Sequence, residues 1–539
     1  MSSRADAPDA QDVDVAIVGA GFAGIGMATQ LARRGRESFV LLERADAVGG
    51  TWRDNVYPGI ACDVPAHLYS FSFRPAGDWG SVFPSGADIR DYLQRTVDDE
   101  GLNPHIRLRC ELLDAHWDAD TGRWYLVTGT GLVRARVFVM AVGRLSEPRM
   151  PEVEGLDSFT GEIVHTAQWR PDVAVAGARI GVVGTGASAI QLIPHLAADA
   201  EELVVFSRTA PYVVPRNDRV YTEDERDELR DPTAASALRE RLLTDADKAF
   251  RQRLGLHPEI DEIRDRALGH LAAQVPDARL REILTPDYEI GCKRILLSDD
   301  FYPTLLRSDV VFEASALDSV VESKARAQSG NTYDLDILVM ATGFEASRPP
   351  AAGRIRGCDG LLLADHWADG MVSYASTSVS GFPNMFVLDG PNAALGHNSA
   401  IYMIETQLDY VLGAVDFLSR DAESSLEVSA SAEVEYTREI DERSASTVWM
   451  TGCGSWYVDP RSGRLTLLWP GTAVSFRERN GVFDPGPYRV TTVGADRPGS
   501  AHHATTPVLA GAPRATGGGH GRSVEPRHIR QIRRSEEHR

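Results

Sequence analysis

Two glycine loops, far apart in the chain, have the residue types and spacing that bind a phosphate group. The first loop follows an apolar strand that the pattern predicts over residues 13–18. Gly19 suits a tight turn, Gly21 lets the backbone approach a pyrophosphate, and Gly24 lets the next helix pack against the strand. The free N–H groups at the start of that helix would face the negative charge of the phosphates. The spacing therefore predicts a dinucleotide site, and a glycine turn in another α/β fold is the alternative.

The residues after the first loop indicate which dinucleotide it binds. A second apolar strand over residues 38–42 ends at Glu43, whose carboxylate can accept hydrogen bonds from ribose hydroxyls and repels a 2′-phosphate. This site therefore suits FAD or NAD better than NADP. Gly50 would allow backbone contact with a large cofactor, and Trp52 offers a flat face to a ring system.

The second glycine loop follows an apolar strand over residues 178–183 and begins Gly184-Thr-Gly. Ala189 takes the place of the third glycine, where a small residue suffices. The next strand ends not in an acid but in Arg208 and Thr209, a cation and a hydroxyl that suit a 2′-phosphate. This loop therefore favours NADPH over NADH, and a solvated arginine at a strand end is the alternative.

A third pattern lies just before the second glycine loop. Four residues fit the spacing FxGxxxHxxxW: Phe159, Gly161, His165 and Trp169. Together with residues 47–52, this pattern resembles the class B flavoprotein monooxygenases, and most closely their Baeyer–Villiger branch. Trp169 favours that branch over flavin-containing monooxygenases and N-hydroxylases, whereas Arg170 departs from the Pro or Asp expected next. The resemblance implies that His165 is a hinge element; taken alone, it would be an ordinary structural histidine.

The resemblance covers nearly the whole folded chain and implies an α/β fold with two Rossmann-like dinucleotide-binding domains. The FAD-binding domain is expected to be discontinuous, over residues 13–145 and 375–494. The NADP-binding domain, over residues 150–222 and 287–374, is expected to be inserted in it. Residues 223–286, where apolar residues recur at helical spacing among many charges, form an expected helical insertion.

The resemblance also assigns cofactor residues by position. The residues expected to bind FAD come from the first loop, the strand ends beside it and the segments near the flavin: Gly19, Gly21, Phe22, Ala23, Gly24, Glu43, Arg44, Gly50, Thr51, Trp52, Asp63, Val64, Tyr69, Leu112 and Asn392. The residues expected to bind NADP come from the second loop and from two cationic segments: Gly184, Thr185, Gly186, Ala187, Ser188, Gln191, Arg208, Thr209 and Lys293.

Two charged residues are expected to carry the chemistry. In the family that the chain resembles, reduced flavin reacts with dioxygen to give a C4a-peroxyflavin, whose deprotonated form attacks a ketone and yields an ester or lactone. A fixed cation would stabilise that anion and the adduct, and arginine stays charged when buried. The resemblance of residues 291–296 assigns this role to Arg294, with Asp63 as its partner. Taken alone, Arg294 would be a surface or salt-bridging arginine, and Asp63 a loop residue.

Three function classes remain open from the residues. The first is the Baeyer–Villiger oxidation of a ketone, and the second is a related monooxygenase that oxidises sulfur or nitrogen. The third is a non-oxygenating FAD oxidoreductase or a flavin-binding regulatory protein, although the chain has no CxxC or CxxxxC pair for a disulfide reductase. Substrate choice is expected to depend on residues 374–380 and 452–457, where Trp456 and Tyr457 either line an apolar pocket or pack in a core.

The composition of the chain limits the kinds of partner that we expect it to bind. The chain has 539 residues and a formal net charge of -21, from 56 basic and 77 acidic residues. Such an acidic surface repels nucleic acids and anionic membranes, so we expect a small organic substrate and dioxygen as partners, with no nucleic acid and no membrane. Residues 1–12 and 495–539 are poor in apolar side chains, and both segments are predicted to be disordered.

Five cysteines are scattered along the chain: Cys62, Cys110, Cys292, Cys358 and Cys453. Their odd number and wide spacing suggest neither a disulfide framework nor a zinc site, and no other metal is expected. A reducing, cytoplasmic setting fits this pattern best. The N-terminus lacks the basic start and apolar stretch of a secretory signal, and no apolar run is long enough to span a bilayer.

Overall fold

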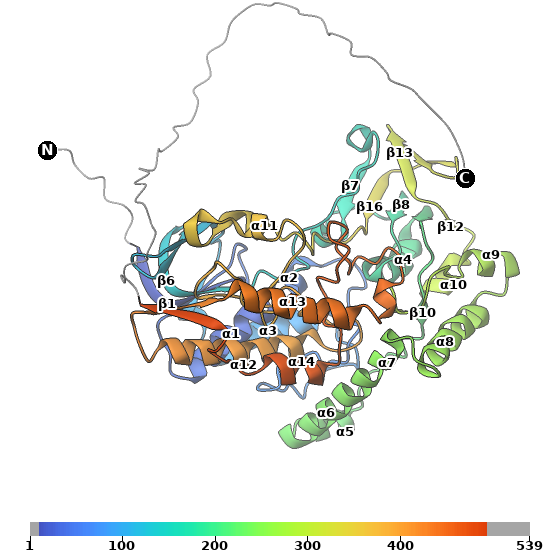
Figure 1. Cartoon of the computed structure of the whole chain (residues 1–539). Coiled ribbons are helices and arrows are strands. Elements are labelled where there is room, and N and C mark those ends of the chain that lie inside the picture. The colour runs from blue at the N-terminus through green and yellow to red at the C-terminus, as the bar shows by residue number, and fades with distance from the viewer. Residues whose placement is uncertain (1–9, 493–539) are drawn as a thin grey trace, which may run out of the picture. The chain divides into compact units, whose positions relative to one another are not determined.

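Two sheets organise the residues that the computed structural model describes, 10–492, and each sheet has a glycine loop near its centre (Figure 1). The predictions for residues 1–9 and for the tail 495–539 lie outside the described residues. The first sheet has the order β17-β4-β5-β6-β1-β2-β3, and β18 also pairs with β6. Its strands are β1 Gln11–Val18, β2 Phe39–Leu42, β3 Ile106–Arg107, β4 Leu112–Asp118, β5 Arg123–Thr128, β6 Gly131–Met140, β17 Ile355–Arg356 and β18 Met385–Val387.

The glycine-rich helix α1, Phe22–Arg33, packs on the first sheet together with α3, Gly86–Asp99, and α12, Ala400–Leu418. At Gly26 an added Cβ would lie 2.9 Å from Leu408 Cδ1, so the absence of a side chain lets α1 approach α12 closely. The centre of this layer is apolar and fully buried. The packing of this layer fixes the start of α1 at the end of β1, and with it the position of the first glycine loop.

The second sheet consists of five parallel strands in the order β12-β9-β8-β16-β7. Its strands are β7 Glu162–His165, β8 Arg179–Val183, β9 Glu202–Phe206, β12 Val310–Glu313 and β16 Ile337–Met340. The helix α4, Ala187–Asp199, follows the second glycine loop. Parallel strands covered on both faces need continuous apolar runs, which β9 and β16 have. The two sheets together confirm the α/β, two-Rossmann fold that the glycine loops predicted.

Two boundaries differ from the sequence analysis. β1 begins at Gln11, inside the segment 1–12 that was expected to be disordered, because its first residues already pair with β6. β17 lies in the range 287–374 that was assigned to the second domain, yet it pairs with β4 of the first sheet. Ile355 is fully buried in the core of that sheet, so the chain returns to the first sheet before residue 375.

The segment 223–286 is helical, as its apolar spacing predicted. Its helices, green in Figure 1, are α5 Glu223–Leu229, α6 Pro232–Lys248, α7 Phe250–Arg253, α8 Glu259–Gln274 and α9 Ala278–Ile283. Local signals explain their starts: Thr222 and Glu225 form a capping box, and Asp231 caps the helix that opens with Pro232.

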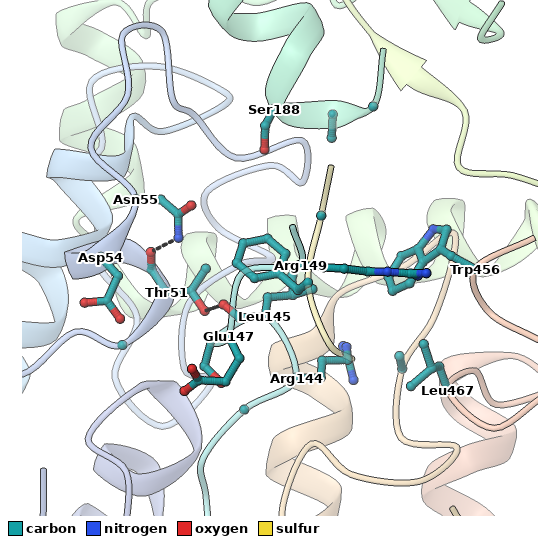
Figure 2. Close-up of a pocket in the computed structure, with 18 of the residues that line it drawn as sticks. Thr51, Asp54, Asn55, Arg144, Leu145, Glu147, Arg149, Ser188, Trp456 and Leu467 are labelled. Atoms are coloured by element: carbon teal, nitrogen blue, oxygen red, sulfur yellow. Dashed lines mark hydrogen bonds between the residues drawn. The ribbon is translucent and has the colours of Figure 1, made fainter. Parts of the chain in front are cut away.

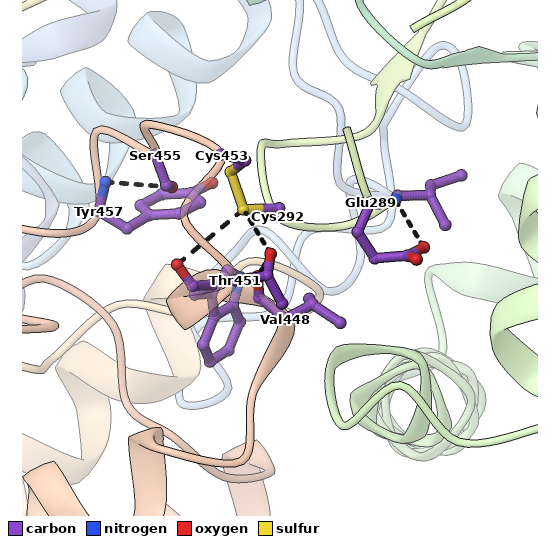
Figure 3. The surroundings of a disulfide bond; sticks show 9 residues. Glu289, Cys292, Val448, Thr451, Cys453, Ser455 and Tyr457 are labelled. Carbon is purple, nitrogen blue, oxygen red and sulfur yellow. Dashed lines mark hydrogen bonds between the residues drawn. A yellow bond between two sulfur atoms is a disulfide. The ribbon is translucent and has the colours of Figure 1, made fainter. Parts of the chain in front are cut away.

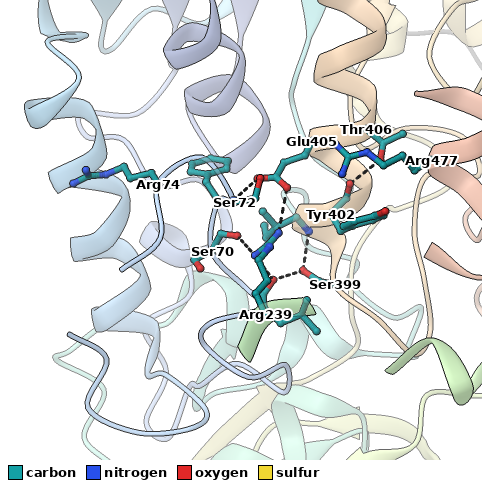
Figure 4. A network of polar contacts seen from close by, with 12 residues as sticks. Ser70, Ser72, Arg74, Arg239, Ser399, Tyr402, Glu405, Thr406 and Arg477 are labelled. Carbon is teal, nitrogen blue, oxygen red and sulfur yellow. Dashed lines mark hydrogen bonds and ion pairs between the residues drawn. The ribbon is translucent and has the colours of Figure 1, made fainter. Parts of the chain in front are cut away.

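A buried arginine ties this helical insertion to the first sheet's layer (Figure 4). Arg239 of α6 donates hydrogen bonds to the carbonyls of His67, Leu68 and Ser70 and pairs with Glu405 of α12 at 3.1 Å. Burial raises the pKa of Glu405, and the charge of Arg239 opposes that shift. Because neither group can lose its partner without leaving a buried charge, α6 is held firmly against α12.

The remaining helices and strands lie outside the two main sheets. The other helices are α2 Thr51–Asp54, α10 Phe301–Leu305, α11 Leu363–His366, α13 Ala430–Ser444 and α14 Ala473–Asn480. The short 3-10 helices are Asn103–His105, Leu156–Ser158, Thr166–Gln168, Pro350–Arg354, Cys358–Gly360 and Val448–Met450. The small sheets comprise β10 Val213–Val214 with β11 Leu296–Leu297, β13 Leu317–Val321 with β14 Lys324–Ala327 and β15 Thr332–Asp334, and β19 Ser424–Val428 with β20 Tyr488–Thr492.

Within residues 10–492, no helix combines the length and the apolar character that a membrane crossing needs. The same residues contain no group of three or more His, Cys, Asp or Glu side chains placed to hold a metal ion.

Candidate functional site

A large cavity, of about 1180 Å³, is lined by both glycine loops. Figure 2 shows part of its wall, including Thr51, Ser188 and Trp456. Gly19 and Gly21 line it from the first sheet, and Gly184 and Gly186 line it from the second. A cavity of this size exceeds what a drug-sized ligand needs, and it is large enough to take more than one ligand.

The backbone around the first loop leaves a cradle that side chains would fill. Gly50 has φ +53°, and an added Cβ there would lie 2.9 Å from the Cα of Gly21. Gly19 has φ +106°, and its added Cβ would lie 2.3 Å from the carbonyl oxygen of Ala141. Glycine is therefore required at both positions, and the chain approaches the cavity with bare backbone, as a pyrophosphate site needs.

Most residues predicted to bind FAD line this cavity: Gly19, Gly21, Phe22, Ala23, Glu43, Arg44, Gly50, Thr51, Trp52, Asp63, Val64, Tyr69 and Leu112. Gly24 does not line it, because an added Cβ would lie only 1.8 Å from the carbonyl oxygen of Gly19 on the packed side of the helix. That close approach is the helix–strand contact that its place in the spacing predicted. Glu43 already accepts hydrogen bonds from the N–H groups of Ala20 and Ala45, both at 2.9 Å, while it lines the cavity.

Asn392, which was predicted to bind FAD, is not among the residues that line the cavity, and its role toward FAD stays a prediction. Its side-chain amide donates to the carbonyls of Leu465, at 2.6 Å, and Leu468, at 2.9 Å, and it is buried. Asn392 thus holds the segment that carries Leu467 and Leu468, which do line the cavity. Buried amides need such partners, and two backbone carbonyls satisfy this one completely on its donor side.

All the residues predicted to bind NADP line the same cavity: Gly184, Thr185, Gly186, Ala187, Ser188, Gln191, Arg208, Thr209 and Lys293. Gln191 also joins the two halves of the site. Its amide donates to the carbonyl of Ala61 at 2.9 Å and accepts from the hydroxyl of Tyr57 at 3.1 Å. Both partners lie on the loop that leads to Asp63, so α4 fixes the position of that loop.

Arg208 and Lys293 form a cationic pair at the cavity wall. Burial lowers the pKa of Lys293, and the positive charge of Arg208 lowers it further. The ammonium of Lys293 also lies 4.5 Å from the ring centre of Tyr288. Within residues 10–492 neither cation forms an ion pair with a carboxylate. Two neighbouring cations that repel each other and face a cavity fit a doubly charged 2′-phosphate.

Arg294 and Asp63 meet between the two dinucleotide sites, and both line the cavity. The guanidinium donates from Nε, at 2.7 Å, and lies 2.6 Å from the same carboxylate oxygen through Nη2. About a third of each side chain is exposed, 31% for Arg294 and 27% for Asp63. The negative charge of Asp63 raises the pKa of Arg294 and outweighs the opposing effect of burial. The arginine is therefore a permanent cation at the cavity surface.

The cysteine spacing suggested no disulfide framework, and for one pair of cysteines this prediction was wrong. Cys292 and Cys453 form a disulfide with Cα atoms 6.4 Å apart, although 161 residues separate them in sequence (Figure 3). Cys292 directly precedes Lys293 and Arg294, and the loop after Cys453 carries Trp456. The bond therefore joins the two cationic residues to the loop that forms another part of the cavity wall.

Sequence reasoning missed a partly buried ion pair in the cavity wall. Arg144 and Asp389 lie 2.5 Å apart, with 13% and 16% of their side chains exposed, and both line the cavity. Burial raises the pKa of Asp389, and Arg144 opposes that shift. The two residues follow the ends of β6 and β18, which pair in parallel, so the fold and not the local sequence brings them together. Trp456 is 47% exposed and lines the cavity, as does Tyr457 at 2%.

None of the four fingerprint residues, Phe159, Gly161, His165 and Trp169, lines the cavity. His165 is 3% exposed, and its Nδ1 accepts a hydrogen bond from the N–H of Ala167 at 3.1 Å. Burial lowers the pKa of His165. Its ring contacts Phe344, a cavity residue, with ring centres 6.2 Å apart. His165 thus lies behind a residue of the cavity wall, and its hinge role stays a prediction.

Comparisons with known proteins agree with this geometry. A model of the NAD(P)-binding Rossmann-like domain matches residues 17–83. The chain is 42% identical to a Baeyer-Villiger monooxygenase of Streptomyces coelicolor over 486 residues, 89% of this chain and 93% of that protein. Its structure is similar to cyclohexanone monooxygenase from Rhodococcus sp. Phi1 bound to NADP+, with a TM-score of 0.78, 30% identity and coverage of 87% and 97%. It is also similar to OTEMO in complex with FAD and NADP, with a TM-score of 0.79, 25% identity and coverage of 89% and 99%.

The cationic pair predicts the cofactor preference. Arg208→Ala should raise the KM for NADPH by about tenfold to a hundredfold, because a hydrogen bond to a charged group contributes about 1.5–3 kcal/mol. The KM for NADH should not rise, since that cofactor lacks the phosphate. Because the pKa of Lys293 is lowered, NADPH binding should weaken at a less alkaline pH than for an ordinary lysine. Steady-state kinetics with both cofactors checks this, and equal losses with both would contradict the assignment.

The disulfide predicts a stability effect. Replacing both Cys292 and Cys453 with Ser should lower the free energy of unfolding by about 2–4 kcal/mol, because the unfolded chain regains the freedom of a long loop. Denaturant unfolding of the FAD-loaded variant beside the wild type, each with and without a reducing thiol, measures it. The wild type should respond to the thiol and the double variant should not. A wild type that ignores the thiol while fully reduced would contradict the prediction.

Proposed function

We propose residue roles for this chain, which belongs to the Baeyer–Villiger monooxygenases and uses FAD, NADPH and dioxygen to insert one oxygen atom beside a ketone carbonyl. The products of this reaction are esters or lactones. Bound flavin, reduced by NADPH, supplies the activation of dioxygen. The protein supplies binding, orientation and charge.

The first glycine loop holds the FAD. Gly21 and Gly50 let the backbone approach the pyrophosphate, and the N-terminus of α1 faces its charge. Trp52 donates a hydrogen bond to the hydroxyl of Tyr69 at 3.2 Å, which fixes both rings beside the cavity. The second loop holds NADPH, with Arg208 and Lys293 on the 2′-phosphate. Because both loops line one cavity, the residues there would hold both cofactors within it.

Arg294 acts on the ketone reaction through its permanent charge. Asp63 receives both of its contacts on one carboxylate oxygen, so the guanidinium is oriented and keeps further donors for the cavity. Those donors stabilise negative charge on oxygen as the ketone is attacked. The single observation that supports this role is the Arg294–Asp63 pair, placed where the residues of both cofactor sites converge.

The substrate is a small organic molecule, and we propose a largely apolar ketone. The wall formed by residues 394–404 and 454–468 has apolar side chains that face the cavity: Ala394, Leu395, Ile401, Ile404, Trp456, Leu467 and Leu468. Such a wall favours a substrate with hydrocarbon groups, because these groups are buried against it. Arg294 supplies the polar contact to the carbonyl.

Loss of the cation tests this assignment. Arg294→Ala should lower the formation of ester or lactone by about a hundredfold to a thousandfold, as for removal of one donor to a developing oxyanion. Arg294→Lys should restore part of the activity, because the charge returns without the planar geometry. Product analysis with a panel of ketones, together with the flavin content of each variant, measures this. Full ketone turnover by a flavin-loaded Arg294→Ala enzyme would rule out the proposed role.

A further inference from the structure

A second arginine is buried close to Arg294 without an acidic partner. Arg253, the last residue of α7, is 5% exposed. Its Nη1 donates a long hydrogen bond to the side-chain oxygen of Gln252, at 3.4 Å. Within residues 10–492 no carboxylate lies within ion-pair distance of it. An unpaired buried charge costs stability, so its presence needs a reason other than folding.

Arg253 packs beneath the turn that carries Arg294. Gly291 has φ +87°, and an added Cβ there would lie 2.7 Å from Nη1 of Arg253. The Cys292–Cys453 disulfide follows directly and holds this turn against the loop of Tyr457 (Figure 3). The helical insertion therefore places the guanidinium of Arg253 under the turn that carries Arg294.

The charged and titratable groups around Arg253 come from three elements. Tyr457 faces it from the disulfide-bound loop, Arg294 from the turn and His397 from the segment before α12. Burial lowers the pKa of Arg253 to about 10, with Tyr457 opposing the shift and Arg294 adding to it. Burial also lowers the pKa of His397, and Arg253 contributes to that decrease.

Neither of the carboxylates in this region pairs directly with Arg253. Asp63 is paired with Arg294. Asp247, on α6, lies 3.7 Å from His397 and accepts hydrogen bonds from the backbone N–H groups of Ala473 and Val474. Asp63 and Asp247 are thus engaged by other groups, and neither forms an ion pair with Arg253.

We propose that Arg253 is a second cation of the active site, which acts through its charge and not by contact to favour negative charge on oxygen beside Arg294. The inference rests on the proposed function, and it adds a consequence for substrate class. Attack on a ketone needs negative charge on the attacking oxygen, whereas oxidation of a sulfide uses a neutral electrophilic oxidant. Arg253 therefore biases the enzyme toward ketones and against sulfides.

The experiment compares FAD-loaded Arg253→Met and Arg253→Lys with the wild type. Arg251→Met is the matched control, because Arg251 lies on the same helix but is exposed and pairs with Glu259. Loss of the charge in Arg253→Met should lower the ratio of ketone to sulfide turnover about tenfold. The rate of ketone oxidation rises with pH, and this rise should shift to a pH about one unit higher in the variant. Arg253→Lys and Arg251→Met should keep the ratio of the wild type.

Thermal unfolding gives a readout that does not depend on turnover. Removing an unpaired buried charge should leave the Tm of Arg253→Met equal to or above that of the wild type. A lower Tm, with ketone and sulfide turnover reduced equally, would mean that Arg253 is structural and would overturn the proposal. An unchanged ratio and pH profile in a stable Arg253→Met would overturn it as well. Failure of the proposed function is distinguishable, because it appears as ketone turnover that survives in Arg294→Ala.

Discussion

The ion pair between Arg294 and Asp63 is the interaction on which the site depends. A guanidinium at a cavity surface can stabilise an oxygen anion only if it is fixed, and a partly buried one needs a partner. Asp63 provides both, because its one oxygen receives two contacts from Arg294. The two residues come from parts of the chain 231 positions apart, so the fold must bring them together.

Several independent contacts hold Arg294 and Asp63 in position. Gln191 of α4 bonds to the loop before Asp63, and the Cys292–Cys453 disulfide anchors the turn before Arg294. The helical insertion adds two further contacts. Arg239 ties the insertion to α12, and Arg253 lies under the turn that carries Arg294. The carboxyl ends of the parallel strands in both sheets supply the glycine loops, the usual place for ligands in open α/β sheets. The cavity is therefore formed by segments that are each held by separate contacts.

The sequence predicted what depends on local spacing. The glycine loops at Gly19 and Gly184 could be recognised because the turn, the strand before it and the helix after it are contiguous. Their cofactor residues line the cavity for the same reason. The backbone partners of Asn392 could not be predicted, because the carbonyls that satisfy its amide lie in a distant segment. The disulfide was missed because nothing in the local pattern of Cys292 points to Cys453.

Burial of charge was equally invisible in the sequence. Arg253 stands in a helix rich in charged residues and looks like a solvated arginine, yet the fold covers it. Arg144 and Asp389 could be paired only after β6 and β18 were known to be neighbours. The ion pair of Arg294 was expected from resemblance alone, since a sequence gives no distance. The hinge role of His165 and the cytoplasmic location stay predictions.

Rapid mixing of the reduced enzyme with oxygen tests the central claim most directly. The FAD-loaded protein is reduced anaerobically with NADPH, then mixed with oxygen alone, with a ketone or with a sulfide, while the flavin absorbance is followed. The account predicts slow return of oxidised flavin without substrate and a faster return with ketone, which Arg294→Ala abolishes while the response to sulfide survives. Rapid return of oxidised flavin that ignores ketone in the wild type would contradict it.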